Sequence, residues 1–300
     1  MKKITTNKMK QLLFFAAIIS GSTAMAQPKL ANQAIINTTT NIIAPEEEEV
    51  SNVQFQGQGG GGGMARMFSG DGETKTVTHV KNDLVKSVSK SEMGRTTTIR
   101  DNQTKITTTL FEIMGNKSGF YATDEEMEAG RKSMDSMMRA GSANDTAKRI
   151  PRPAEPPKIN ISVTDETKKI AGYTCKKAYV ITTRILGIKD TSIAWFTPDV
   201  KINNVVSTGG GMTSIMSMGS PTSNPTAGLE LIEGFVMRFE TKMRRSRTMV
   251  VEVTKLEIDK EVAEKEFTIP KDFDVKPMSE MRNMMRGGAQ GGQRMMIRAN

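Results

Sequence analysis

Two residue types that carry much of enzyme chemistry are almost missing from this sequence. The 300 residues include one cysteine, Cys175, and one histidine, His79. An internal disulfide and a Cys₂His₂ metal site are therefore excluded. Motifs that mark hydrolase nucleophiles, paired catalytic carboxylates or dinucleotide binding are also missing. A Cys/His dyad is geometrically conceivable because distant residues can meet in a fold, but the composition as a whole predicts a protein that is not an enzyme and carries no cofactor.

Long apolar runs are also missing, apart from a short one near the N-terminus. The stretch "MKKITTNKMKQLLFFAAIISGSTAMAQ" has a lysine-rich head, an apolar run from Leu12 to Ile19, and Ala24-Met25-Ala26 before Gln27. These are the parts of a secretory signal peptide, cleaved after Ala26. A membrane anchor would need about 20 apolar residues, roughly twice this run. The mature chain is expected in the periplasm without a transmembrane segment, and the same signal also permits secretion beyond the outer membrane.

The positive charge is modest and local. The net charge of +9 falls to +5 once the four lysines of the signal are removed. No basic stripe interleaved with aromatic residues is present, so nucleic acid is not an expected partner. Lys242, Arg244, Arg245 and Arg247 lie together between two strand-like runs. They predict a solvated hairpin tip or, alternatively, a contact with an anionic surface of the cell envelope.

Composition divides the chain into four segments. Residues 1–26 form the signal peptide. Residues 27–70 contain the run "GQGGGGG", and glycine brings no side chain to bury, so we predict a disordered leader there. Residues 71–277 are long enough for one sizeable core. Residues 278–300 are rich in methionine, arginine and glycine and are predicted to form a flexible tail.

The core segment reads mainly as β-structure. Short runs rich in threonine and other β-branched residues are separated by the turn signals "KND", "DNQ" and "GNK". Strands joined so closely must be antiparallel neighbours. In "FVMRFETKM", Phe235, Met237 and Phe239 alternate with Val236, Arg238 and Glu240, as in a strand buried on one face. In "TMVVEVTKLEI" the apolar positions change parity, which predicts a bulge near Thr254 or Lys255.

One helix interrupts the strands, at about residues 124–140. Thr123 and Glu126 have the spacing of a capping box, and Met127, Met134 and Met138 recur at helical spacing. Methionine adapts its shape to irregular neighbours, so this stripe suits either core packing or contact with a guest molecule.

Several motifs resemble exported proteins of Gram-negative envelopes. "KKIAGYTCKKAYV" followed by "AWFTPDV" resembles a signature of GLPGLI-type proteins and of a neighbouring family of unknown function. "GLELIEGFVMRFE", Gly228 to Glu240, lacks the proline of the GLPGLI form, so the neighbouring family is the nearer match. "EFTIPKDFDV", Glu266 to Val275, is similar to the closing strand of periplasmic lipoprotein carriers of the LolA type. The resemblance covers about residues 70–277.

This resemblance implies a strongly curved antiparallel sheet, or half-barrel, with one helix against its concave face. In LolA-type carriers that concavity shelters acyl chains. By analogy, a lipid or lipoprotein ligand is the expected partner of this chain. The residues expected to line the cavity are Tyr173, Cys175, Trp195, Phe235, Met237, Phe239, Met127, Met134 and Met138.

Two other interpretations of function stay open. The first is a non-catalytic structural or interaction protein of the envelope whose sheet is simply packed. The second is Cu(I) binding by the thioethers of the C-terminal methionines, from Met278 to Met296, although the arginines among them would repel a cation. Cys175 shares a strand face with Tyr173 and Tyr179, which predicts a core position. An intermolecular or redox role for its thiol is the alternative.

Overall fold

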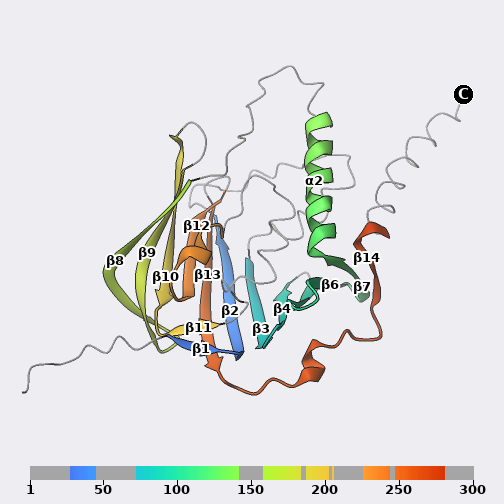
Figure 1. The fold of residues 1–300 in the computed structure, drawn as a ribbon, viewed down its shortest axis with the longest axis horizontal. Coiled ribbons are helices and arrows are strands. Elements are labelled where there is room, and N and C mark those ends of the chain that lie inside the picture. The colour runs from blue at the N-terminus through green and yellow to red at the C-terminus, as the bar shows by residue number, and fades with distance from the viewer. Residues whose placement is uncertain are drawn as a thin grey trace, which may run out of the picture.

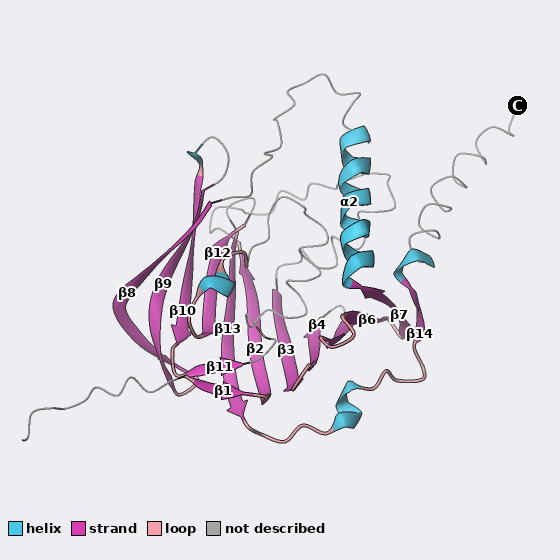
Figure 2. Ribbon diagram, in the orientation of Figure 1, coloured by secondary structure: helices cyan, strands magenta, loops and turns pink. Residues whose placement is uncertain are grey.

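The computed structural model describes residues 28–44, 72–92, 94–141, 158–183, 187–202, 205, 226–243 and 247–280. Figure 2 shows that this part of the chain is mainly β-structure. Two short strands, β1 (Lys29–Ala31) and β11 (Val200–Ile202), pair in parallel as a sheet of their own. The other strands form one large sheet.

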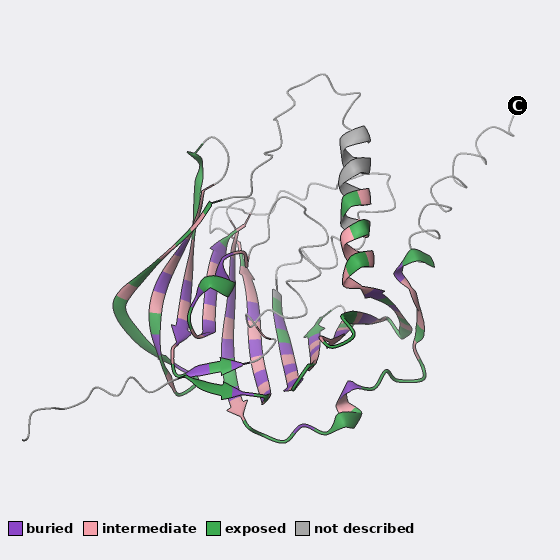
Figure 3. Ribbon diagram, viewed as in Figure 1, coloured by how far each residue is buried: buried purple, intermediate pink, exposed green. Residues whose placement is uncertain are grey.

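The large sheet has twelve strands. Half of them are β2 (Gln33–Ile43), β3 (Gly72–Lys81), β4 (Leu84–Ser91), β5 (Gly94–Asp101), β6 (Ile106–Ile113) and β7 (Asn116–Thr123). The others are β8 (Lys158–Ile170), β9 (Tyr173–Thr183), β10 (Lys189–Thr197), β12 (Phe235–Lys242), β13 (Thr248–Ile258) and β14 (Asp274–Pro277). Their spatial order is β14-β7-β6-β5-β4-β3-β2-β13-β12-β10-β9-β8. The described strands therefore form an open sheet with edges at β14 and β8, and β8 is exposed along most of its length (Figure 3).

Consecutive hairpins build the half of the sheet from β3 to β7. Each neighbouring pair is antiparallel, and the turns place Asn82, Lys105 and Met114 at positive φ. The predicted antiparallel meander is confirmed here. Strand β4 has the sequence LVKSVSKS, which carries small serines where apolar residues would give a clear alternation.

The prediction of a disordered leader over residues 27–70 is wrong for its first part. Strand β2 lies in the middle of the sheet, paired antiparallel with β3 on one side and with β13 on the other. Its inward positions carry Ala34 and Ile36, which are buried, and then Thr38 and Thr40, which are buried too. Only the first two inward positions of β2 are apolar, and the next two are threonines. The sequence therefore shows no apolar alternation that would predict a buried strand. Residues 45–71, including the glycine run, lie outside the described residues.

The predicted bulge in the last long strand is confirmed. The register of β13 on β2 shifts between Val253 and Lys255. The extra residue lets Val253 and Leu256, which differ in parity, both reach the same buried cluster.

The predicted helix is confirmed as α2 (Asp124–Gly141), which starts directly at the end of β7 (Figure 1). Its capping box forms as expected: the Glu126 N–H donates to Thr123 Oγ1 at 3.2 Å, and the Thr123 N–H donates to Glu126 Oε2 at 2.9 Å. Arg100 of β5 donates from Nη2 to Asp124 Oδ2 at 2.9 Å, which ties the first helical residue to the sheet. In the described part of the chain no helix has the length and apolar character to cross a membrane.

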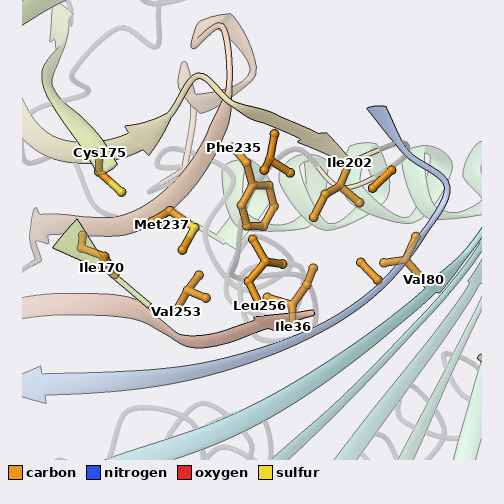
Figure 4. Packing of buried hydrophobic residues seen from close by; sticks show 12 residues of the cluster. Ile36, Val80, Ile170, Cys175, Ile202, Phe235, Met237, Val253 and Leu256 are labelled. Atoms are coloured by element: carbon orange, nitrogen blue, oxygen red, sulfur yellow. The ribbon is translucent and has the colours of Figure 1, made fainter. Parts of the chain in front are cut away.

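Two apolar clusters fill the half of the sheet around β13 and β12. The β2 cluster joins Ile36 and Val80 to residues of β9, β12 and β13, and the paired strands β1 and β11 add Ala31, Val200 and Ile202 (Figure 4). The η3 cluster gathers Ala178, Val180, Phe196, Val236, Phe239 and their neighbours, together with Leu229 and Ile232. Leu229 belongs to η3 (Leu229–Leu231), a single turn of 3₁₀ helix.

A long segment crosses the sheet from β13 to β14, and we call residues 259–273 the strap. Figure 1 shows it leaving β13 and reaching β14 at the sheet edge. Its short helix η5 (Glu264–Phe267) brings Phe267, with Val262 and Phe273, against Ile99 and Leu110 of the sheet. Three lysines of the sheet also reach the strap, in the pairs Lys81–Glu264, Lys86–Glu266 and Lys117–Asp272.

Glycine is required where η3 meets the sheet. Gly228 has φ of 92°, and a Cβ there would lie 2.7 Å from Ile159 Cγ2 and 2.9 Å from Val180 Cγ1. Both neighbours are β-branched and stiff at χ1. Gly172, in the β8–β9 turn, has φ of 88° with nothing within 4 Å of the same position.

We expect deletion of residues 27–70 to abolish folding, because it removes the strand that joins the two halves of the sheet. The comparison is between chains that begin at residue 27 and at residue 71, followed by circular dichroism on heating. Cooperative melting of the shorter chain would contradict the central place of β2.

Gly228→Ala is expected to lower the free energy of unfolding by about 2 to 5 kcal/mol, since left-handed strain and overpacking add. Gly172→Ala should lose only the strain, about 1 to 2 kcal/mol. Urea unfolding followed by the fluorescence of Trp195, the single tryptophan, measures both. Equal losses would show that η3 does not pack as described.

Candidate functional site

The signature "KKIAGYTCKKAYV" forms the hairpin of β8 and β9. Ala171 and Gly172 make the turn with positive φ, and the strand that follows serves two cores. Cys175 belongs to the β2 cluster, while Ala178 and Val180 belong to the η3 cluster. Cys175 and Ala178 are an odd number of residues apart, so their side chains point to opposite sides of β9. Each side of this strand therefore packs into a different cluster.

Cys175 is a packing residue. It is fully buried, in the same cluster as Ile170 and Met237 (Figure 4). Burial raises the pKa of its thiol to about 11, because a thiolate would lose its hydration. Its Sγ lies 3.6 Å from the Tyr173 carbonyl oxygen. The predicted core position is confirmed, and a buried thiol with a raised pKa is a poor nucleophile.

The strand residues expected to line a ligand cavity pack against one another. Cys175, Phe235 and Met237 are members of the β2 cluster, and Tyr173 and Trp195 pack against it. Phe239 belongs to the η3 cluster instead. Cys175, Phe235, Met237 and Phe239 are each at most 2% exposed. The fold thus brings five of these six residues together, but in a packed core.

The sequence predicts that β12 is buried on one face only. This prediction is wrong at the start of the strand. Val236 is as buried as Phe235 and Met237, and it joins the η3 cluster whereas they join the β2 cluster. The register of β10 on β12 shifts between Trp195 and Phe196. A bulge there turns successive side chains toward different cores.

Of the predicted methionine stripe of α2, the structure describes only the side chain of Met127. Met127 packs against Phe120, Ala122, Phe111 and Met278 in what we call the helix cluster. The side chains of Met134 and Met138 lie outside the described residues. Met278, which the sequence assigned to the flexible tail, is buried in this cluster, and this corrects the prediction for that residue. The later methionines are not described, so Cu(I) binding stays a prediction.

The face that carries Ala34 and Ile36 continues across β3 to β6 as a layer of hydroxyl groups. Cross-strand pairing aligns threonine with serine or threonine from strand to strand. Two such pairs are hydrogen-bonded, Thr76 to Ser89 and Thr78 to Ser87, each at 2.9 Å. The buried members of the layer are Thr38, Thr40, Thr74, Thr76, Thr78, Ser87, Ser89, Thr98 and Thr109.

His79 lies on the opposite face of the sheet from Val80, because successive strand residues point to opposite sides. Burial lowers the pKa of His79, with Glu266 opposing and Lys86 adding to that shift. Val80 shares the β2 cluster with Cys175. The sheet therefore separates His79 from Cys175, and the Cys/His dyad left open by the sequence is not formed.

The predicted hairpin of β12 and β13 is confirmed, and the Met243 N–H donates to the Arg247 carbonyl oxygen at 2.7 Å at its described end. Arg247 is half-buried. Arg244 and Arg245 lie outside the described residues, so contact of this tip with an anionic surface stays a prediction.

A groove that no sequence motif marks lies between the strap and strands β4 to β7. It has a volume of about 220 Å³. Its lining includes Lys86, Arg95 and Lys117 from the sheet, and Asp272 and Phe273 from the strap. These residues are scattered over almost 190 positions of sequence, from 86 to 273, so only strand register and the path of the strap bring them together. Within the described chain no cluster of three or more His, Cys, Asp or Glu is placed to hold a metal ion.

Comparison with known proteins leaves the family open. No family model matches the chain, and no curated protein matches it. Two crystal structures of PNGF-II, in space groups C2 and P21, are similar at 13% and 14% sequence identity, with TM-scores of 0.36 and 0.35. The alignments cover 84% and 85% of this chain but only 32% and 33% of those chains. This chain thus spans about a third of their length, and a likeness so distant carries no argument about fold or function.

We expect Cys175 to resist thiol reagents in the folded protein at pH 8 and to react fully in urea, because the thiol is buried. Wild type should also lose stability between about pH 9 and pH 11, since the unfolded chain releases the thiol proton at lower pH than the folded one. Cys175→Ala lacks this group and should show a smaller loss over the same range. Rapid modification of the native thiol would contradict its core position.

Proposed function

We propose that this chain is an exported, periplasmic protein that acts by binding rather than by catalysis, and that its broad sheet is a packed scaffold. The observation that carries this proposal is the packing of the residues expected to line an apolar cavity. They contact one another, and β1, β11 and η3 cover them. An envelope interaction protein with a packed sheet is therefore better supported than a carrier of a lipid or lipoprotein.

The hydroxyl layer supports the same proposal. An acyl chain gains free energy by leaving water for apolar surroundings, at about 25 cal/mol for each Å² buried. Against Thr76, Thr78, Ser87 and Ser89 it would instead meet hydroxyls that already bond in cross-strand pairs. The face next to Ile36 and Val80 thus offers little to an acyl chain beyond the two apolar clusters.

The rival proposal keeps the likeness to LolA-type carriers. In it the sheet is a half-barrel, the helix lies against its concave face, and a lipid or lipoprotein enters between them. The helix cluster favours it, because Met127 and Met278 meet Phe111 and Phe120 there and methionine repacks readily around a guest. The likeness to GLPGLI-type proteins stays part of both proposals, since both are exported envelope proteins.

The two proposals differ in what they expect of Leu229. If the η3 cluster is a permanent core, Leu229→Ala should cost about 2 to 5 kcal/mol in free energy of unfolding. Leu231, in the same short helix but 58% exposed, is the matched control, and Leu231→Ala should change stability by about 0.5 kcal/mol or less. Urea unfolding of both variants tests the difference.

Native mass spectrometry of the protein from its own periplasm supplies the second measurement. The packed scaffold predicts a chain that starts at Gln27 and carries no lipid. A co-purifying lipid, together with a Leu229→Ala variant as stable as wild type, would favour the carrier proposal. A chain that retains residues 1–26 would overturn the assignment of export by a cleaved signal.

A further inference from the structure

The groove beneath the strap has an apolar middle between two charged ends. Cross-strand register places Val88 beside Thr97 and Thr97 beside Leu110, which makes a row across β4, β5 and β6. Leu110 is buried, as is Ile99 in the adjoining row. Phe273 of the strap packs against the cluster that these two residues form with Val262 and Phe267. A ligand lying along this row would therefore contact hydrocarbon on the sheet side and on the strap side.

Lys86 forms one end of the groove. Its side chain is only 17% exposed, and its ammonium donates to the Glu266 carbonyl oxygen at 2.6 Å. The Glu266 carboxylate is farther away, at 3.7 Å. An ammonium has three donors, so this lysine can donate to a second close partner. A charge-assisted hydrogen bond in such a sheltered position is stronger than one between neutral groups.

The other end carries two cations and two carboxylates. Lys117 is paired with Asp272 at 2.5 Å, and this hydrogen bond raises the pKa of Lys117 and lowers that of Asp272. Arg95 has a longer contact, 3.5 Å, with Glu112, which also lies 4.0 Å from Lys117. Lys117 is thus already paired with Asp272 of the strap, while Arg95 keeps donors for an anion.

We propose that this groove binds a small carboxylate with a short, unbranched apolar body, whose carboxylate pairs with Lys86 and whose body lies along Val88, Ile99 and Leu110. Lys86 selects the charge of the ligand: its sheltered ammonium has donors beyond the one given to the Glu266 carbonyl oxygen, and a carboxylate accepts such a hydrogen bond more strongly than a neutral group does. The volume of the groove limits the size of the ligand. Its 220 Å³ is below the roughly 300 to 1,000 Å³ of pockets that hold drug-sized ligands, so the ligand must be small. The proposal rests on the proposed binding function and names a ligand class for it.

Hexanoate and 1-hexanol are matched probes, since they differ in the anionic group and share the alkyl chain. The experiment titrates each into the mature chain, from Gln27, and follows backbone amide signals of Val88, Ile99 and Leu110 by NMR. We expect saturable shifts with hexanoate, and binding of hexanol weaker by about tenfold, the order expected for one charge-assisted hydrogen bond. Equal affinities, or no shifts at these amides, would overturn the proposal.

Two lysine variants separate ligand contact from loosening of the strap. Lys86→Met should weaken hexanoate binding by about tenfold and leave hexanol unchanged. Lys81→Met removes another lysine that reaches the strap, through Glu264 at 3.3 Å, without lining the groove, and should bind hexanoate as wild type does. Equal losses in both variants would mean that the strap, and not Lys86, governs binding.

A third variant covers the case in which Lys86→Met does not fold. Val88→Phe fills the middle of the groove and should remove hexanoate binding while Lys86 stays in place; retained binding would refute the site. These outcomes are independent of the scaffold test. If Leu229→Ala is destabilising and no lipid co-purifies, yet hexanoate fails to bind, the groove proposal alone is wrong.

Discussion

The pairing of β2 with both β3 and β13 is the constraint on which the rest of this structure depends. Ile35 of β2 stands opposite His79 on one side and opposite Glu257 on the other. The strands β3 to β7 come next in the chain after β2, whereas β13 follows only after β8 to β12. Contacts between residues so far apart close large loops and form late in folding. Without β2 the two halves would each expose an open edge.

Once β2 is in place, the two faces of the sheet have different roles. On one face, Ile36 and Val80 cluster with residues of β1 and β11, while hydroxyl pairs such as Thr76 with Ser89 fill the half toward β6. On the other face, the strap covers Ile99 and Leu110. This division suits a core built with few aromatic residues, because threonine fits a pleated strand and the hydroxyls of Thr76 and Thr78 bond to serines of the next strand.

The strap is held by more than its lysines. Ion pairs at exposed positions, such as Lys117 with Asp272, stabilise a fold only weakly, so the burial of Phe267 and Val262 against the sheet must contribute more. Gln33 adds a fixed point, because its side-chain oxygen accepts the Val262 N–H at 3.1 Å and its carbonyl oxygen accepts the Asp259 N–H at 2.8 Å. The strand that organises the sheet thus also positions the start of the strap, and with it the roof of the groove.

The sequence by itself determined the features that depend on neighbours in the chain. The meander, the capping box of Thr123 and Glu126, the β13 bulge and the buried Cys175 all follow from local spacing and residue type. Tertiary structure alone decided that β2 is central, that Val236 is buried, and that Lys86, Arg95 and Phe273 share a groove. The physical reason is that burial and register belong to pairs of segments: Thr38 looks like a loop residue until Thr76 and Val253 stand beside it, and only the folded sheet brings them there.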